Sequence, residues 1–199
     1  LHPDRLSDSG SKTLEISNGE WLESIIKKLS QPELVTIADP ARDFGATLRH
    51  YQQKGLNWLS FLDSLGFGAC LADDMGLGKT IQILGFLSIL RIKEPDKTAL
   101  LIVPASLISN WENEIKKFLP NLKYYIAHPG YIKNGHIKKE DTQTSKQKPD
   151  LADVNLVITT YAMAHRHKWM EEFHWRCLIL DEAQAIKNSS SLRWKALLN

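Results

Sequence analysis

The stretch LADDMGLGKT at residues 71–80 decides the fold that we expect for this chain. Gly76 and Gly78 allow the backbone to turn several N–H groups toward one bound anion. Lys79 adds a positive charge for the outer phosphates of a nucleotide, and the hydroxyl of Thr80 suits a magnesium ion. A helix that begins here adds the positive end of its dipole. The stretch therefore predicts a phosphate-binding loop.

The surroundings of this loop support that interpretation, with one departure. The apolar run GACLA at 68–72 predicts a strand before the loop, and apolar spacing over 79–93 predicts a helix after it. The strict loop pattern has glycine at the position of Asp73, so the match is one residue short. A glycine-containing turn before an ordinary helix is the alternative interpretation.

Beyond the loop, short apolar runs alternate with helical patterns, the second of which covers 107–118. We expect strands at four further runs: ALLIV (99–103), KYYIA (123–127), NLVIT (155–159) and CLILD (177–181). Strands that alternate with helices are typical of βαβ units. The predicted class is α/β, a mostly parallel sheet with helices on both faces.

The run LILDEAQ at 178–184 ends its apolar part in two carboxylates, Asp181 and Glu182. Ligands of a parallel sheet bind beyond the carboxyl ends of its strands, where we also expect the phosphate-binding loop. One carboxylate could hold hydrated magnesium while the other polarises an attacking water. Taken alone, the run could also be a strand that enters a solvated acidic turn.

The N-terminal part of the chain lies outside this alternation. A short amphipathic helix before Pro32 and a linker at 38–43 precede a helical pattern over 48–65. We therefore divide the chain into an N-terminal helical segment with its linker, residues 1–44, and a nucleotide-binding domain, residues 45–199.

The polar stretch 128–153 interrupts the domain and predicts a long surface loop or a partly disordered insertion. Its lysines could follow a phosphate backbone, but a solvated loop is equally consistent because acidic residues interrupt them. These lysines are Lys133, Lys138, Lys139, Lys146 and Lys148. The last residues before Asn199 have a helical pattern without an ending signal, so we expect the chain to be cut from a longer protein.

Composition excludes several classes. The net charge of +2 over 199 residues is too small to predict a nucleic-acid partner by itself. Cys70 and Cys177 cannot build a disulfide framework or a cysteine zinc site, so a reducing compartment is expected. Since no apolar run approaches the roughly 20 residues of a membrane span, we expect no membrane partner. We expect a monomer in the cytoplasm, associated with the nucleoid if the source is prokaryotic.

Five segments together resemble the SWI/SNF-like ATPases of helicase superfamily two. LADDMGLGKTIQ and LILDEAQAIKN resemble the two ATPase motifs of that family, in which an aspartate commonly stands at the position of Asp73. LRHYQQKGLNWL (48–59) resembles its adenine-reading segment, LIVPASLISNWENEIKKF (101–118) its motif Ia and VITTYAM (157–163) its motif Ib. The resemblance covers residues 48–188, and the D-E-A-Q form of the acidic box is most similar to bacterial and archaeal members.

The resemblance implies a RecA-like P-loop domain, the first of two that enclose ATP and Mg²⁺. It assigns adenine recognition to Gln52 and catalysis to Lys79 and Glu182. Magnesium, held through water, is assigned to Thr80 and Asp181. The nucleotide-binding residues that it implies are Gln52, Asp74, Met75, Gly76, Leu77, Gly78, Lys79 and Thr80. Because the second RecA-like domain and its arginine fingers are missing from this chain, we expect hydrolysis by the chain alone to be near background.

Members of the family move double-stranded DNA through the two domains without separating its strands, and they remodel complexes bound to it. A motor that accepts every sequence should hold phosphates rather than base edges. In motifs Ia and Ib we expect weak, non-specific DNA contacts from three hydroxyls at strand-to-helix junctions: Ser106, Thr159 and Thr160. Helix capping is their alternative role, and one residue can do both.

Two functions of different classes remain open. One is an ATP-driven motor, and the other is a nucleotide-dependent binding module that binds ATP and DNA or protein but does not hydrolyse alone. A P-loop kinase is disfavoured, because motifs Ia and Ib and the acidic box have no role there. Core or edge packing is favoured over base stacking for Trp58, Trp111, Trp169 and Trp175. The His-Arg-His cluster at 165–167 lacks the partners that a metal site needs.

Overall fold

The computed structural model describes residues 19–131, 149–164 and 166–186. It divides the chain into two compact units, Leu1–Thr36 and Ile37–Asn199. In the first unit the expected amphipathic helix is present as α1 (Glu20–Ser30), followed by a short helical turn at Pro32–Leu34. No side chain of α1 is buried, so this helix contributes little to a hydrophobic core.

The second unit is built on a four-stranded parallel sheet with the strand order β2-β3-β1-β4. Its strands are β1 (Ala99–Val103), β2 (Tyr124–Ile126), β3 (Leu156–Thr160) and β4 (Leu178–Leu180). Each overlaps one of the four runs from which a strand is expected after the loop, and the parallel pairing confirms the α/β class. Every residue of the two central strands is buried, because helices cover both faces of a parallel sheet.

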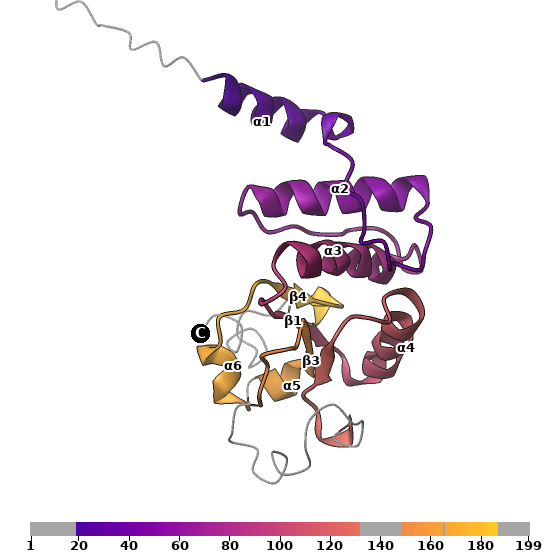
Figure 1. The fold of residues 1–199 in the computed structure, drawn as a ribbon, viewed down its shortest axis with the longest axis vertical. Helices are drawn as coiled ribbons and strands as arrows, with labels where there is room; N and C mark the ends of the chain where they lie inside the picture. The colour runs from indigo at the N-terminus through magenta and orange to yellow at the C-terminus, as the bar shows by residue number, and fades with distance from the viewer. Residues whose placement is uncertain (1–18, 132–148, 165, 187–199) are drawn as a thin grey trace, which may run out of the picture. The chain divides into compact units, whose positions relative to one another are not determined.

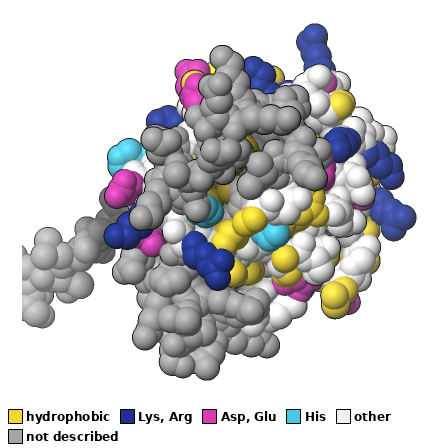
Figure 2. Space-filling model, turned by 90° about the horizontal axis from the view of Figure 1, so that it is seen from below, with side chains coloured by type: hydrophobic (Ala, Val, Ile, Leu, Met, Phe, Trp, Pro, Cys, Tyr) yellow, Lys and Arg dark blue, Asp and Glu magenta, His cyan; other side chains and the backbone are white. Residues whose placement is uncertain are grey.

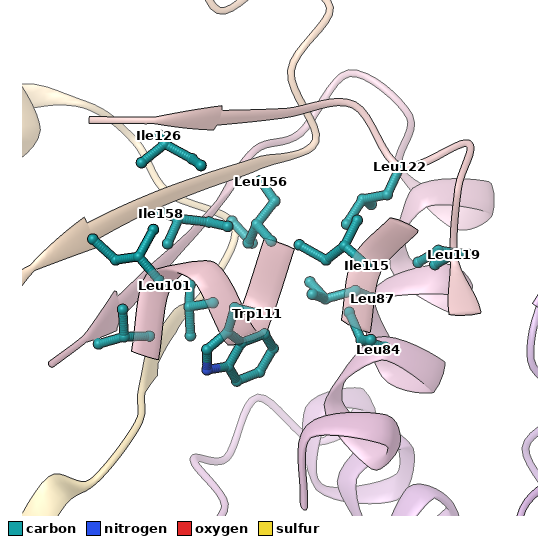
Figure 3. Close-up of a cluster of buried hydrophobic side chains, with 13 residues drawn as sticks. Leu84, Leu87, Leu101, Trp111, Ile115, Leu119, Leu122, Ile126, Leu156 and Ile158 are labelled. Carbon is teal, nitrogen blue, oxygen red and sulfur yellow. The ribbon is translucent and has the colours of Figure 1, made fainter. Parts of the chain in front are cut away.

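Helices lie on both faces of the sheet, as the alternation predicts (Figure 1). Those described in this unit are α2 (His50–Ser64), α3 (Lys79–Lys93), α4 (Ile108–Phe118), α5 (Tyr161–Ala164) and α6 (Lys168–Glu172). Helices α3 and α4 pack on strand residues such as Leu101 and Ile158, in the core that Figure 3 shows. Helices α5 and α6 pack on the alternate residues, such as Ile102 and Val157. The period of two along each strand therefore separates two cores.

Helix α2 packs on α3 rather than on the sheet. Leu56 and Leu59 of α2 meet Phe86 and Leu90 of α3 in a third apolar cluster. None of the described helices combines the length and the apolar character needed to cross a membrane.

The segment at 38–43, expected to be a linker, is packed against the second unit. The backbone N–H groups of Ala38 and Ala41 donate to side chains of α2 and α3, each at 2.9 Å. The carboxylate of Asp43 accepts a 2.7 Å hydrogen bond from Arg91 of α3. The segment therefore belongs to the fold of the second unit, while the domain boundary expected after it stays a prediction.

The strand expected at 68–72 is absent, and that prediction is wrong. Residues 67–74 are irregular, and Phe67 is 57% exposed. A strand forms where its backbone groups pair with a neighbour. Among the described strands, β4 ends the sheet and pairs only with β1, so the apolar run before the loop pairs with none of them.

The polar insertion at 128–153 is described only at its two ends. Residues 132–148, which include all five lysines, and the helical pattern before Asn199 lie outside the described residues. At one end, Pro129–Tyr131 form a short helical turn. At the other end, Leu151 is buried in the core under α5 and α6, so part of the expected surface loop is anchored to the sheet.

Candidate nucleotide-binding site

The turn that precedes α3, here called the phosphate loop (residues 73–80), depends on its two glycines. Gly76 and Gly78 have φ angles of 83° and 80°, in the left-handed region that glycine enters without steric cost. A side chain at Gly78 would also collide with Gln52, whose Nε2 lies 2.5 Å from the position of an added Cβ. Gly78 is the N-cap of α3, so the loop ends where the helix dipole is positive.

Lys79, the first residue of α3, turns its side chain back into the phosphate loop. Its Nζ donates hydrogen bonds to the carbonyl oxygens of Asp73 at 2.7 Å and Asp74 at 3.1 Å. The positive charge therefore lies inside the turn, held by two neutral acceptors. A phosphate oxygen is a stronger acceptor for an ammonium group than a carbonyl oxygen is, so this amine can exchange partners when an anion arrives.

Asp73, the departure from the strict loop pattern, ties the loop to the helices behind it. Its Oδ2 accepts a hydrogen bond of 2.9 Å from Nε2 of Gln82 on α3. Gln82 is completely buried, and its Oε1 has no hydrogen-bond partner among the described residues. This oxygen lies 1.9 Å from the position of an added Cβ at Gly55 of α2. Asp73 therefore anchors the loop to α3 through its carboxylate, while its carbonyl accepts from Lys79.

Gln52, assigned to adenine recognition by the resemblance, lies against the phosphate loop and is only 7% exposed. Its Oε1 accepts from the backbone N–H of Arg49 at 2.9 Å, which caps α2. Its Nε2 donates to the carbonyl of Leu77 at 3.1 Å, and the hydroxyl of Tyr51 donates to the same carbonyl at 3.1 Å. The amide oxygen of Gln52 is thus bonded at the start of α2 and its nitrogen holds the loop, and its contact with a base stays a prediction.

The two carboxylates lie at the same edge of the sheet as Lys79. Helix α3 leads through residues 94–98 into the start of β1, and Glu94 accepts a 2.7 Å bond from Arg176, just before β4. The end of α3 is therefore at the amino edge of the sheet. Since the helix runs antiparallel to the strands, Lys79 at its start lies toward the carboxyl edge, where Asp181 follows β4.

Asp181 and Glu182 form a turn that several hydrogen bonds hold in place. The Asp181 N–H continues the ladder by donating to Ile102 of β1 at 2.9 Å, and its Oδ1 accepts from the N–H of Glu182 at 3.0 Å. Glu182 has a φ of 52°, the only positive value of a non-glycine residue in the described part of the chain. Gln184 donates to the Glu182 carboxylate. Strained backbone of this kind persists where surrounding contacts determine it, often at functional sites.

Trp111 is a site residue that the sequence does not reveal as one. Its indole N–H donates to Oδ2 of Asp181 at 2.7 Å, while its ring, 3% exposed, lies in the core of Figure 3. The expectation of core packing is confirmed for this residue and for Trp169, which is also buried. A buried indole usually finds an acceptor, but nothing in the sequence says which of the available acceptors it is.

The three hydroxyls expected to contact DNA differ in exposure. Ser106 is exposed on the turn after β1. Thr159 is fully buried, and its hydroxyl donates to the carbonyl of Ala127 at 3.0 Å. Thr160 is buried too, and its hydroxyl accepts from the N–H of Met163 at 3.3 Å, in the capping role weighed above. Both threonine hydroxyls are used inside the fold, and their contact with DNA stays a prediction.

Other candidate centres have little support. Among the described residues, no three His, Cys, Asp or Glu side chains gather as metal ligands, and His165 of the His-Arg-His cluster lies outside them. Burial raises the pKa of the Cys177 thiol to about 11, so it is protonated and unreactive at neutral pH. Figure 2 shows Lys and Arg side chains scattered over one face of the molecule rather than gathered in one patch.

A glycine turn at the start of a helix, a lysine amine inside that turn and two carboxylates at the same sheet edge define a class, the P-loop nucleotide-binding domains. Comparison with known families identifies the family of this chain within that class. The model of the SNF2-related domain matches residues 51–199. The chain belongs to this family, as the resemblance of its motifs predicts.

Individual relatives of the chain support this family membership. The chain is 36% identical over 196 residues to the chromatin-remodeling ATPase INO80 of Arabidopsis thaliana, covering 98% of this chain and 12% of that protein. It is 41% identical over 176 residues to INO80 of Pyricularia oryzae, covering 86% of this chain and 8% of that protein. The chain thus spans a small part of these relatives.

A solved structure confirms the RecA-like fold. The SWI2/SNF2 ATPase core of Sulfolobus solfataricus in complex with dsDNA matches with a TM-score of 0.69 at 36% identity. The match covers 81% of this chain and 31% of that one.

Proposed function

We propose that this chain is the ATP-binding lobe of an ATP-dependent translocase that moves along double-stranded DNA without separating the strands. The observation that carries the proposal is the phosphate loop with the amine of Lys79 inside it, at the sheet edge that also presents Asp181 and Glu182. The named relatives are chromatin-remodeling ATPases, and the matched solved structure is a complex with dsDNA. Both support the proposal.

In this proposal the phosphate loop holds the nucleotide. Gly76 and Gly78 have left-handed φ angles, a backbone conformation that can turn N–H groups toward an anion. The amine of Lys79 exchanges its two carbonyl partners for phosphate oxygens and neutralises charge there. Asp74, Met75 and Leu77 contribute backbone contacts, because loops of this kind present N–H groups to the anion; the side chain of Met75 is 82% exposed.

The donor set at the sheet edge fits Mg²⁺, which prefers hard oxygen ligands and retains several waters. Thr80 offers a hydroxyl in the first turn of α3, and Asp181 offers a carboxylate through water. Bound there, the ion would neutralise charge on the phosphate oxygens. Glu182 is the residue that orients the attacking water and accepts its proton, and the bond from Gln184 directs its carboxylate.

For DNA, the exposed turn at Ala105–Leu107 is the element that we propose as a phosphate contact, with Ser106 as its hydroxyl donor. The net charge of +2 provides little general attraction. We therefore expect an affinity no better than that of generic non-specific binding, with a Kd of about 10⁻⁴–10⁻⁶ M that weakens as salt rises.

The competing function is a nucleotide-dependent binding module that binds ATP without turnover. Charge that builds on the transferred phosphoryl group needs an arginine finger, which contributes about 10³–10⁵ in rate in related reactions. The match covers 31% of the solved ATPase core, and we propose that the finger comes from the rest of such a core, so residues 1–199 alone should hydrolyse ATP at a near-background rate. Joining the second domain should restore turnover, and Glu182→Gln should abolish that gain; turnover that stays at background with the second domain joined would favour the binding module.

The nucleotide site is tested by titration calorimetry with Mg-ADP. Lys79→Ala should weaken binding by about tenfold to a hundredfold, because one charge-assisted bond to phosphate contributes about 1.5–3 kcal/mol. Lys93→Ala is the matched control, since it removes an exposed lysine from the last position of the same helix. Equal affinities of the two variants would exclude the phosphate loop as the binding site.

A further inference from the structure

Three elements other than β4 hold Asp181 in place. Trp111 of α4 donates its indole N–H to the carboxylate oxygen Oδ2 at 2.7 Å. Tyr161, the first residue of α5, donates its hydroxyl to the Asp181 carbonyl at 2.8 Å. Ile102 of β1 accepts the Asp181 N–H at 2.9 Å. The last bond continues the sheet ladder, but the other two come from side chains that the assignment of the ATP site leaves without a role.

The bonds also fix the neighbouring carboxylate. With Oδ2 of Asp181 held by Trp111, its Oδ1 faces the N–H of Glu182, which it accepts at 3.0 Å. That bond closes the turn in which Glu182 has its left-handed φ of 52°. If the Asp181 carboxylate rotated, the N–H of Glu182 would lose its acceptor and the strained turn would lose a support.

We propose that Trp111 and Tyr161 are positioning residues that hold Asp181 and Glu182 in the geometry needed for magnesium-dependent nucleotide binding. The inference rests on the proposed function. Trp111 fixes the rotation of the carboxylate, and Tyr161 fixes the backbone that carries it. Both are anchored, since the ring of Trp111 lies in the core under α4 and Tyr161 is buried in the core under α5. Neither touches the nucleotide in this proposal.

The experiment uses Trp111→Phe, which keeps an aromatic ring in the core and removes the N–H. ADP affinity is measured by calorimetry with Mg²⁺ and again with EDTA, and the ratio gives the gain that magnesium brings. Partners that orient metal ligands contribute about 10–100-fold in metal affinity. We expect Trp111→Phe to reduce the magnesium-dependent gain by about tenfold and to leave the affinity in EDTA unchanged. Tyr161→Phe should reduce the gain by a smaller factor, because it loosens only the backbone.

Trp175→Phe is the matched control. Trp175 donates its indole N–H to the carbonyl of Met170, also at 2.7 Å, so the same chemical change removes a bond of the same length that leads to no carboxylate. A merely structural role would lower the melting temperatures of both variants without changing the magnesium-dependent gain. The proposal is overturned if Trp111→Phe and Trp175→Phe show the same gain as the unsubstituted chain.

A spectroscopic measurement keeps the test open if Trp111→Phe does not fold. In the unsubstituted, ¹⁵N-labelled chain with ADP bound, adding Mg²⁺ should move the indole N–H signal of Trp111 and leave that of Trp175 in place. An unmoved Trp111 signal would refute the positioning role. An unsubstituted chain whose ADP binding does not depend on magnesium would instead refute the proposed function, so the two failures are distinguishable.

Discussion

Replacing Glu182 by glycine should make the fold more stable than replacing it by alanine. Glu182 has a φ of 52°, and a left-handed conformation costs an L residue roughly 1–2 kcal/mol through crowding of its Cβ. Glycine escapes that cost but loses about 0.5–1 kcal/mol more backbone entropy than alanine on folding. Both substitutions remove the carboxylate and its bond from Gln184, so that loss cancels in the comparison. The net difference is about 0.5–1 kcal/mol in favour of Glu182→Gly.

Urea unfolding followed by circular dichroism measures this difference, and thermal unfolding should show a shift of about 1–4 °C for a chain of this size. The control is the same pair of substitutions at Gln184, an exposed residue of the turn Ala183–Ile186 that has no positive φ. There alanine should be the more stable residue, by about 0.5–1 kcal/mol. The sign of the glycine-to-alanine difference should therefore reverse between two positions only two residues apart.

A result in which Glu182→Gly is equal to or less stable than Glu182→Ala would refute strain at this position. Both variants should lack hydrolysis in a protein that contains the second domain, because neither retains the carboxylate that we propose orients the attacking water. If Glu182→Gly is more stable than Glu182→Ala and both variants lose turnover, the left-handed turn lowers stability while it directs a carboxylate that turnover needs.

Two further predictions concern the ion pairs behind the site. Arg176 donates to Asp63 through Nη1 and Nη2, both at 2.8 Å, and to Glu94 through Nε at 2.7 Å. Arg176→Met leaves these two partly buried carboxylates without a cation. The substitution should therefore lower the free energy of unfolding, measured in urea, by about 2–3 kcal/mol. Arg176→Lys should recover only part of this, because lysine lacks the planar fork, and full recovery would contradict the bidentate geometry. The hydrogen bond from Arg91 lowers the pKa of Asp43, against the effect of burial, so the stability from this pair is present above the ordinary carboxyl pKa of about 4 and is lost as pH falls below it. Asp43→Asn should be less stable at neutral pH and should lose less stability between pH 5 and pH 2 in urea unfolding; a parallel pH profile would refute the shift.

Local chemistry made much of the fold predictable. The helix at 79–93 is present as α3 with the same bounds, because its apolar spacing and the glycine before it act within one segment. The four strands after the loop follow from continuous apolar runs. The run at 68–72 has a similar composition, yet it forms no strand. The composition of a segment shows that it can form a β-strand, but whether it does depends on its packing and on pairing with a neighbouring strand.

The candidate site shows the same division. The sequence by itself determined the phosphate loop and the two carboxylates, because phosphate binding needs particular residue types at adjacent positions. Only the tertiary structure decided that Trp111 reaches Asp181, 70 positions along the chain, and that the hydroxyls of Thr159 and Thr160 point into the protein. These outcomes depend on strand register, which pairs Ile102 with Leu180 and Val103 with Thr160. A shift of one residue would turn every side chain of a strand to the other face, and register is set by how all the segments pack together.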